Sequence, residues 1–181
     1  MRKEGTKIRL RELEEKDAES LYPIWSDPEV VRYLNMEAAA AITEVRSMIY
    51  ILRSLAGKKK AYRWSIISLK TNEILGTCGF NEWDEENARG EIGYELGRKH
   101  WGHGYMQEAL VLLLDYAFTS MGANRIEAKV VPQNTVSLLL LEKLHFRYEG
   151  LLRKYELMNG QYEDVRLLSL LSEEFPVIGD A

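Results

Sequence analysis

Residues 90–106 read GEIGYELGRKHWGHGYM, and this stretch determines how the rest of the chain is interpreted. Its first part, residues 91–96, has the length and residue pattern of a strand. Gly102 and Gly104 follow, and from Met106 onward apolar residues recur at helical spacing. The sequence therefore predicts a strand, a turn with two glycines and a helix in direct succession.

The predicted turn has the features of a phosphate-binding site. Glycine has no Cβ, so the backbone can approach a ligand closely, and the first N–H groups of a helix are unpaired at the positive end of its dipole. Arg98, Lys99 and His103 add positive or hydrogen-bond-donating groups. The pattern predicts a site for phosphate or pyrophosphate. The P-loop ending Gly-Lys-Ser/Thr is absent, and Gln107 stands where a dinucleotide fingerprint needs a third glycine, so both of those nucleotide sites are excluded.

The remaining chain alternates between helices and strands without repeats or linkers. Apolar residues at helical spacing predict helices over residues 18–25, 30–34, 42–55, 106–118 and 136–144. Strand patterns cover residues 7–11, 62–69, 74–80, 91–96, 125–131, 148–158 and 162–171. We expect residues 83–87 to form a polar loop, Gly57 to end the third helix, and Asn159-Gly160 to form a hairpin turn. The predicted fold class is α+β, with a mixed, mostly antiparallel central sheet flanked by helices.

Composition limits the function classes. The chain has 181 residues, which suits one domain, expected to span residues 1–181. The formal net charge of −4 provides no overall attraction to nucleic acid or to an anionic membrane surface, so neither is an expected partner. Cys78 is the single cysteine and the histidines show no ligand spacing, so neither a disulfide nor a metal site is expected. The charged N-terminus lacks the apolar region of a signal peptide, and the expected location is the cytoplasm.

A second segment, residues 132–150, strengthens the interpretation of the glycine turn. Residues 132–137 read PQNTVS, and residues 138–150 read LLLLEKLHFRYEG. Together with the glycine turn, this part of the chain resembles the GNAT superfamily of N-acetyltransferases, in the branch of the ribosomal-protein-alanine acetyltransferases (RimJ/RimL-like). The close matches cover residues 74–150. His145 stands where the family's Glu-Lys-Leu-Gly-Phe sequence has a glycine.

The resemblance implies acetyl-CoA as the cosubstrate and no metal. Residues 99–104 match the family's pyrophosphate loop, Gln/Arg-x-x-Gly-x-Gly/Ala, with a lysine in its first position. The backbone of residues 94–96 would pair with the pantetheine arm, which would lie between the strands at 91–96 and 125–131. The implied coenzyme-binding residues are Tyr94, Leu96, Arg98, Lys99, Gly102, His103, Gly104, Tyr105 and Asn134.

The resemblance also implies a general base on the strand at 91–96, where Glu91 matches the family's glutamate. Strand alternation places Glu91 and Glu95 on the same face, so Glu95 stays an alternative, as do Glu82 and a water molecule. Many relatives carry a tyrosine that acts as the general acid at the position of residue 141. This chain has Leu141 there, and its apolar side chain cannot donate a proton. Ser137, from the family's Asn-x-x-Ser motif, is the expected proton donor to the leaving thiolate.

The acceptor expected from the family is a primary amine, and the branch favours the N-terminal alanine or serine of a protein. Three alternatives stay open: a small amine such as a polyamine or an antibiotic as acceptor, a non-catalytic acyl-CoA-binding or regulatory domain, and a structural or interaction protein, because a fold does not fix a function. The family also leads us to expect a homodimer.

Overall fold

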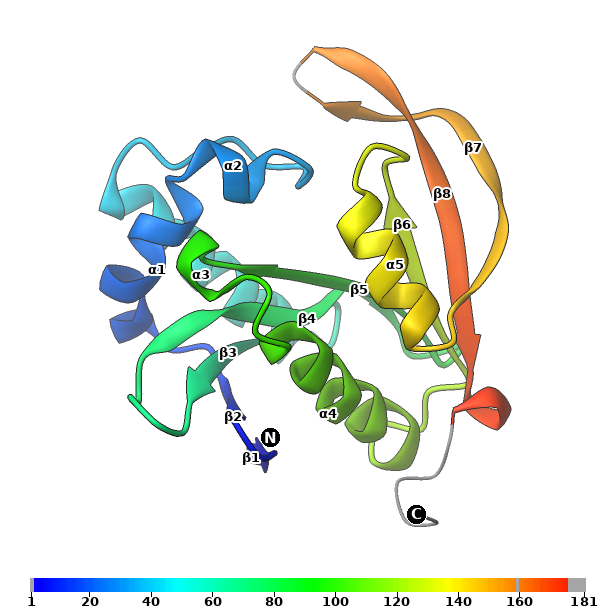
Figure 1. The fold of residues 1–181 in the computed structure, drawn as a ribbon, viewed down its shortest axis with the longest axis horizontal. Helices are drawn as coiled ribbons and strands as arrows, with labels where there is room; N and C mark the ends of the chain where they lie inside the picture. The colour runs from blue at the N-terminus through cyan, green and yellow to red at the C-terminus, as the bar shows by residue number, and fades with distance from the viewer. Residues whose placement is uncertain (1, 159, 176–181) are drawn as a thin grey trace.

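The computed structural model describes residues 2–158 and 160–175, and its centre is an eight-stranded sheet (Figure 1). The strand order is β1-β2-β3-β4-β5-β6-β8-β7, and every neighbouring pair is antiparallel except β5 and β6. The strands are β1 (Arg2–Glu4), β2 (Ile8–Glu12), β3 (Tyr62–Ser68), β4 (Ile74–Asp84), β5 (Arg89–Leu96), β6 (Arg125–Val130), β7 (Arg147–Met158) and β8 (Gln161–Leu171). The predicted α+β class with a mixed, mostly antiparallel sheet is confirmed.

Helices cover both faces of this sheet, and their bounds are α1 (Ala18–Trp25), α2 (Pro28–Val31), α3 (Ile42–Gly57), α4 (Tyr105–Thr119) and α5 (Thr135–Lys143). The apolar side of α4, including Leu110 and Leu113, packs in the main core with Ile92 of β5 and Leu141 of α5. A second core joins α1 to α3 and lies on the opposite side of β5, where Trp25 contacts it. The central strands are therefore buried between two helical layers. Within the described residues, no helix is long and apolar enough to cross a membrane.

The two parallel strands at the centre of the sheet separate part-way along their length. Their pairing runs from Arg89 opposite Arg125 to Glu91 opposite Glu127. Beyond that point β5 continues to Leu96 and β6 continues to Val130, but the described residues show no further pairing between them. The backbone groups of β5 that face β6 are therefore left without a partner strand from Ile92 onward.

One local prediction is wrong, one is confirmed and one short strand was missed. Trp83 is not part of a polar loop, because β4 extends to Asp84 and the Trp83 ring is buried in the core. Gly57 is the last helical residue of α3, so the prediction that it ends this helix is confirmed; its φ is not positive, and the left-handed residue that follows is Lys59, with φ of 56°. The short strand β1 was not predicted, because three residues are too few for a recognisable pattern. Asn159 of the predicted hairpin turn lies outside the described residues.

Candidate active site

The glycine turn between β5 and α4 has the backbone conformation that an anion site requires. Gly102 and Gly104 have φ of 76° and 78°, in the left-handed region that side chains with a Cβ disfavour. A Cβ on Gly102 would meet nothing within 4 Å, so conformation rather than space calls for glycine there. Helix α4 begins at Tyr105, directly after the turn, and Gly104 provides no capping side chain. The first N–H groups of α4 are thus available to a ligand.

A lysine that the sequence did not single out reaches this turn from the far end of the chain. Lys7 Nζ donates to the carbonyl oxygen of His103 at 3.3 Å. The turn that carries Lys7 is fixed to α4, since Glu108 Oε1 accepts hydrogen bonds from the backbone N–H groups of Thr6 at 2.5 Å and Lys7 at 2.8 Å. A Cβ on Gly5 would lie 2.1 Å from the same oxygen, so glycine permits this contact. An exposed ammonium group therefore stands beside the glycine turn.

Arg98 and Lys99, which were predicted to meet the coenzyme, each face a carboxylate. Arg98 Nε lies 2.6 Å from Asp27 Oδ2, and Lys99 Nζ lies 3.7 Å from Glu73 Oε1. Both basic side chains are exposed. A bound anion would have to compete with these pairs, so Lys7 is the less encumbered cation at the turn.

The residues predicted to hold the pantetheine arm lie where β5 and β6 have separated. The Leu96 carbonyl already accepts a hydrogen bond from Trp101 Nε1 at 2.8 Å. Asn134 directly precedes α5, and its Oδ1 accepts from the Ser137 N–H at 3.2 Å, so its side-chain oxygen serves as the helix N-cap. Its NH₂ group is the part that a ligand could use.

The side chain of Tyr94 brings a further hydroxyl to Ser137. Burial raises the pKa of Tyr94 to about 12, and the Ser137 hydroxyl opposes that rise. The Tyr94 hydroxyl is buried, and within the described residues it makes no hydrogen bond of ordinary geometry. The two hydroxyls therefore lie close together, on the α4 and α5 side of β5, without a well-formed bond between them.

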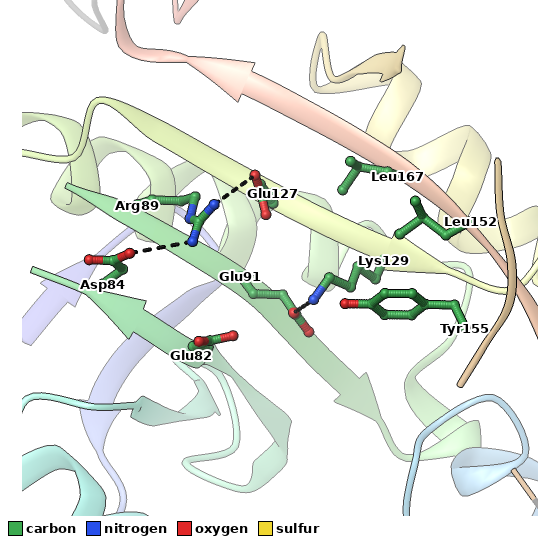
Figure 2. Close-up of a pocket in the computed structure, with 9 residues that line it drawn as sticks. All are labelled: Glu82, Asp84, Arg89, Glu91, Glu127, Lys129, Leu152, Tyr155 and Leu167. Atoms are coloured by element: carbon green, nitrogen blue, oxygen red, sulfur yellow. Dashed lines mark hydrogen bonds and ion pairs between the residues drawn. The ribbon is translucent and has the colours of Figure 1, made fainter. Parts of the chain in front are cut away.

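Glu91 lies on the opposite face of β5, in a pocket of about 320 Å³ (Figure 2). The lining residues are Glu82, Asp84, Arg89, Glu91, Glu127, Lys129, Leu152, Tyr155 and Leu167. Glu91 Oε2 forms an ion pair with Lys129 Nζ at 2.7 Å, and the ring of Tyr155 lies against the same ammonium group, 5.1 Å from its centroid. Burial lowers the pKa of Lys129, but the bonds to Glu91 and Tyr155 outweigh it and hold that pKa above its usual range. Lys129 is thus charged at neutral pH.

A model of the acetyltransferase (GNAT) domain family matches residues 7–147. The chain belongs to the GNAT family of N-acetyltransferases. It is 49% identical over 169 residues to the uncharacterized N-acetyltransferase p20 of Bacillus licheniformis, covering 93% of this chain and 95% of that protein. It is 31% identical over 120 residues to the ribosomal protein uS5-alanine N-acetyltransferase of Escherichia coli, covering 64% of this chain and 60% of that protein. The structure of Mycobacterium smegmatis RimJ in complex with CoA-disulfide matches with a TM-score of 0.86 and 28% identity, covering 93% of this chain and 84% of that one.

Of the three carboxylates considered as the base of this GNAT enzyme, Glu95 is the one the structure shows to be buried. Its Oε1 accepts hydrogen bonds from Trp25 and Thr77, and Arg63 lies 3.9 Å from Oε2. Burial raises the pKa of Glu95, and Arg63 opposes that rise. Because α1 covers Glu95, the hydrogen bonds of this carboxylate connect the sheet to the helix. Glu82 is exposed and shares the pocket with Glu91.

The predicted site residues of this GNAT enzyme thus divide between the two faces of β5. Tyr94 and Ser137 share one face, whereas Glu91 occupies the other, with Lys129 and Tyr155 beside it. Sequence reasoning missed Lys7 and Lys129, since a lone lysine in a turn or on a strand has no pattern that distinguishes it from a solvated one. Cys78 is buried, and burial raises the pKa of its thiol well above the usual range, so it is an unreactive thiol. Within residues 2–158 and 160–175, no group of three or more His, Cys, Asp or Glu side chains could hold a metal ion.

Proposed function

We propose that this GNAT enzyme uses acetyl-CoA to acetylate the α-amino group of a protein N-terminus that begins with alanine or serine. The observation that carries the proposal is the position of Glu91 at the point where β5 and β6 stop pairing, with a polar pocket on its own face and Ser137 on the other side. The uS5-alanine N-acetyltransferase of E. coli, which shares 31% identity over its matched region, supports this acceptor class.

The residues present fit coenzyme A. The left-handed Gly102 and Gly104 leave the first N–H groups of α4 open for a diphosphate, and Lys7 places a positive charge beside them. Beyond Glu91, the unpaired edge of β5 offers backbone groups to an extended arm, as a neighbouring strand would. We assign the diphosphate to residues 102–105, with Arg98 and Lys99 as flanking charges, and the arm to residues 94–96 and Asn134.

Bound acetyl-CoA supplies an acetyl group on a thioester. The acceptor nitrogen forms a bond to the acetyl carbon, the carbon–sulfur bond breaks, and Glu91 takes the proton that the amine loses. Ser137 donates a hydrogen bond to the departing sulfur, which becomes a thiol by taking a proton from solvent. A CoA thiol of ordinary pKa, about 8.5, is a good leaving group, so weak assistance from Ser137 suffices.

The pairing of Glu91 with Lys129 favours an α-amine over a lysine side chain. An α-amine with a pKa of about 8 is roughly 10% neutral at pH 7, whereas a lysine at about 10.4 is neutral at only about 0.04%. A carboxylate that already holds a cation removes a proton less readily than a free one. Proton removal by Glu91 is therefore sufficient for the α-amine of an N-terminus and insufficient for a lysine side chain.

The test is mass spectrometry of products after incubation with acetyl-CoA and three acceptor pools: peptides with free N-termini, polyamines and aminoglycosides. We expect acetylation at the α-amine of peptides that begin with alanine or serine, and none at internal lysines. Acetylation confined to polyamines or aminoglycosides would overturn the acceptor class. Binding of CoA by calorimetry without turnover on any pool would favour a non-catalytic acyl-CoA-binding domain instead, and absence of CoA binding would favour a structural or interaction protein. Sedimentation of the same sample checks the expected homodimer.

A further inference from the structure

Both carboxylate oxygens of Glu91 are held by side chains from neighbouring strands. Lys129 of β6 approaches Oε2 at 2.7 Å, and Asn81 Nδ2 of β4 donates to Oε1 at 3.4 Å. A glutamate side chain loses considerable rotamer freedom when it is fixed, and two contacts from opposite sides restrict it more than one. Lys129 supplies a positive charge to Glu91, whereas Asn81 is neutral and supplies a hydrogen-bond donor.

The orientation of the Asn81 carboxamide follows from its partner on the other side. Arg63 NH2 lies 2.9 Å from Asn81 Oδ1, and a guanidinium group can only donate, so the oxygen must face Arg63 and the NH₂ must face Glu91. Arg63 is itself fixed, since its NH1 donates to the Gly93 carbonyl at 2.8 Å and lies 3.9 Å from the buried carboxylate of Glu95. An asparagine, with one accepting and one donating end, matches this position.

The backbone of β4 and β5 is shaped to bring Asn81 there. Phe80 pairs with Ile92 and Glu82 pairs with Glu91, so Asn81 is the extra residue of a β-bulge. Such bulges redirect side chains, and here two consecutive residues, Asn81 and Glu82, are both exposed between the buried Phe80 and Trp83.

Gly93 provides the space for the carboxamide. A Cβ on Gly93 would lie 2.3 Å from Asn81 Oδ1 and 2.6 Å from Nδ2, so the carboxamide lies directly over this glycine. The φ of Gly93 is not positive, so close approach, and not conformation, is what requires glycine at this position.

We propose that Asn81 is a positioning residue for Glu91: held by Arg63 over Gly93, its NH₂ group fixes the carboxylate that takes the proton from the acceptor amine. The inference rests on the proposed role of Glu91 as the base. Asn81 does not act on the substrate; it acts through Glu91.

The decisive variant is Asn81→Asp, which keeps the shape of the side chain and the oxygen that faces Arg63. It replaces the donor to Glu91 with a like charge, so Glu91 should bind its proton at higher pH. We expect the acid limb of the kcat/KM profile to move up by about one pH unit, so that activity falls by up to about tenfold on that limb and stays near the wild-type value at pH 9. The charged or titratable groups that share the pocket with Glu91 in the wild type are Lys129 and Glu127 of β6, Glu82 and Asp84 of β4, Arg89 of β5 and Tyr155 of β7; Arg63 of β3 lies on the other side of Asn81.

The matched control is Asn87→Asp in the loop after β4. Asn87 Nδ2 donates to Asp84 Oδ2 at 2.7 Å, so the change also replaces a carboxylate's donor with a charge at the rim of the same pocket, without touching Glu91. Its acid limb should coincide with that of the wild type. An equal movement in both variants would mean that net charge, and not the Asn81 contact, is responsible, and would overturn the inference.

The titration of Glu91 can also be read without any acceptor, from NMR of ¹³C-glutamate-labelled protein assigned with Glu91→Gln. Asn81→Asp should move that titration to higher pH and Asn87→Asp should not; an unmoved titration in Asn81→Asp overturns the inference. The proposed function fails separately, if wild type acetylates no α-amine or if Glu91→Gln keeps full activity. In either of those cases the role of Asn81 in catalysis falls as well, whatever the NMR result.

Discussion

The two faces of β5 where it leaves β6 are built from different parts of the protein. On the α4 and α5 side, the proposed anion site consists of backbone: two left-handed glycines and the start of a helix. On the other side, the pocket around Glu91 consists of charged side chains from several strands. A backbone site should tolerate changes of its side chains and fail when a Cβ is added, whereas the side-chain pocket should show the opposite behaviour.

The largest expected effect is on the side-chain face. Glu91→Gln removes the proposed base and should lower kcat/KM by about 100-fold at pH 7, at the lower end of what general-base catalysis provides. The Kd for CoA should stay unchanged, because Glu91 lies on the other face of β5. Steady-state kinetics and calorimetry on the same protein measure both quantities.

Glu82→Gln is the control for that variant. Glu82 shares the pocket and the charge of Glu91, but within the described residues no hydrogen bond or ion pair connects the two carboxylates. Its kcat/KM should fall less than threefold. Full activity of Glu91→Gln between pH 6 and 9 would remove the base assignment.

The second effect is on the backbone face. Gly104→Ala adds a Cβ at φ of 78°, which strains the backbone by about 1–2 kcal/mol in the form that binds the diphosphate. We expect the Kd for CoA to rise about tenfold, because about 1.4 kcal/mol corresponds to that factor. The rate at saturating acetyl-CoA should change little. Gly57→Ala, in the last turn of α3 with open space around it, should leave the Kd unaltered.

The same contrast explains what could be predicted from the sequence. Gly102, Gly104 and the start of α4 are local in the chain, so their spacing predicts the turn and the helix that follows it, whereas the choice of Glu91 as base came from the family resemblance. The pocket is assembled from residues as distant in sequence as Asp84 and Tyr155, and no local pattern marks them.

Local sequence patterns also fail to indicate the position of a side chain where tertiary contacts determine it. Trp83 follows a polar run yet packs in the core, because the bulge at Asn81 returns its side chain to the buried face. An aspartate directly before a helix is a common N-cap, but the carboxylate of Asp17 before α1 does not cap it and is turned inward, where it accepts hydrogen bonds from Arg11 and Ser65.

A third effect tests the charge beside Glu91. Lys129→Met removes the counter-ion, so Glu91 should take up a proton at higher pH and the acid limb of the kcat/KM profile should move up by about one pH unit. Because the pKa of Lys129 is raised, the stability that it contributes is fully present below the ordinary lysine pKa of about 10.4 and is lost only as pH rises beyond it. The wild-type pH–rate profile should therefore show no alkaline fall from Lys129 below pH 10. Lys129→Arg should restore the acid limb; a profile in Lys129→Met identical to wild type would contradict the role of the pair.

A smaller effect separates the cations at the glycine turn. Lys7→Ala should raise the Kd for CoA about threefold at low salt, since exposed charge pairs contribute about 0.2–1 kcal/mol. Arg98→Ala should change the Kd less than twofold, because Asp27 already occupies that guanidinium group. The Lys7 effect should disappear at 0.5 M salt, where screening is strong. Calorimetry at two salt concentrations measures it, and equal effects of the two variants would contradict the assigned contacts.

The smallest effect concerns α5, which carries Asn134 and Ser137 to the backbone face. His145 follows this helix with φ of 66°, its N–H bonds to the Glu142 carbonyl, and the next N–H bonds to Leu141, the pattern of a Schellman motif that favours glycine. His145→Gly should therefore stabilise the fold by about 0.5–1 kcal/mol and raise Tm by about 1–4 °C, without changing kcat. His145→Ala keeps the Cβ and should give no gain, which distinguishes backbone strain from any effect of the ring. A loss of stability in His145→Gly would mean that the imidazole, and not the turn, matters at the end of α5.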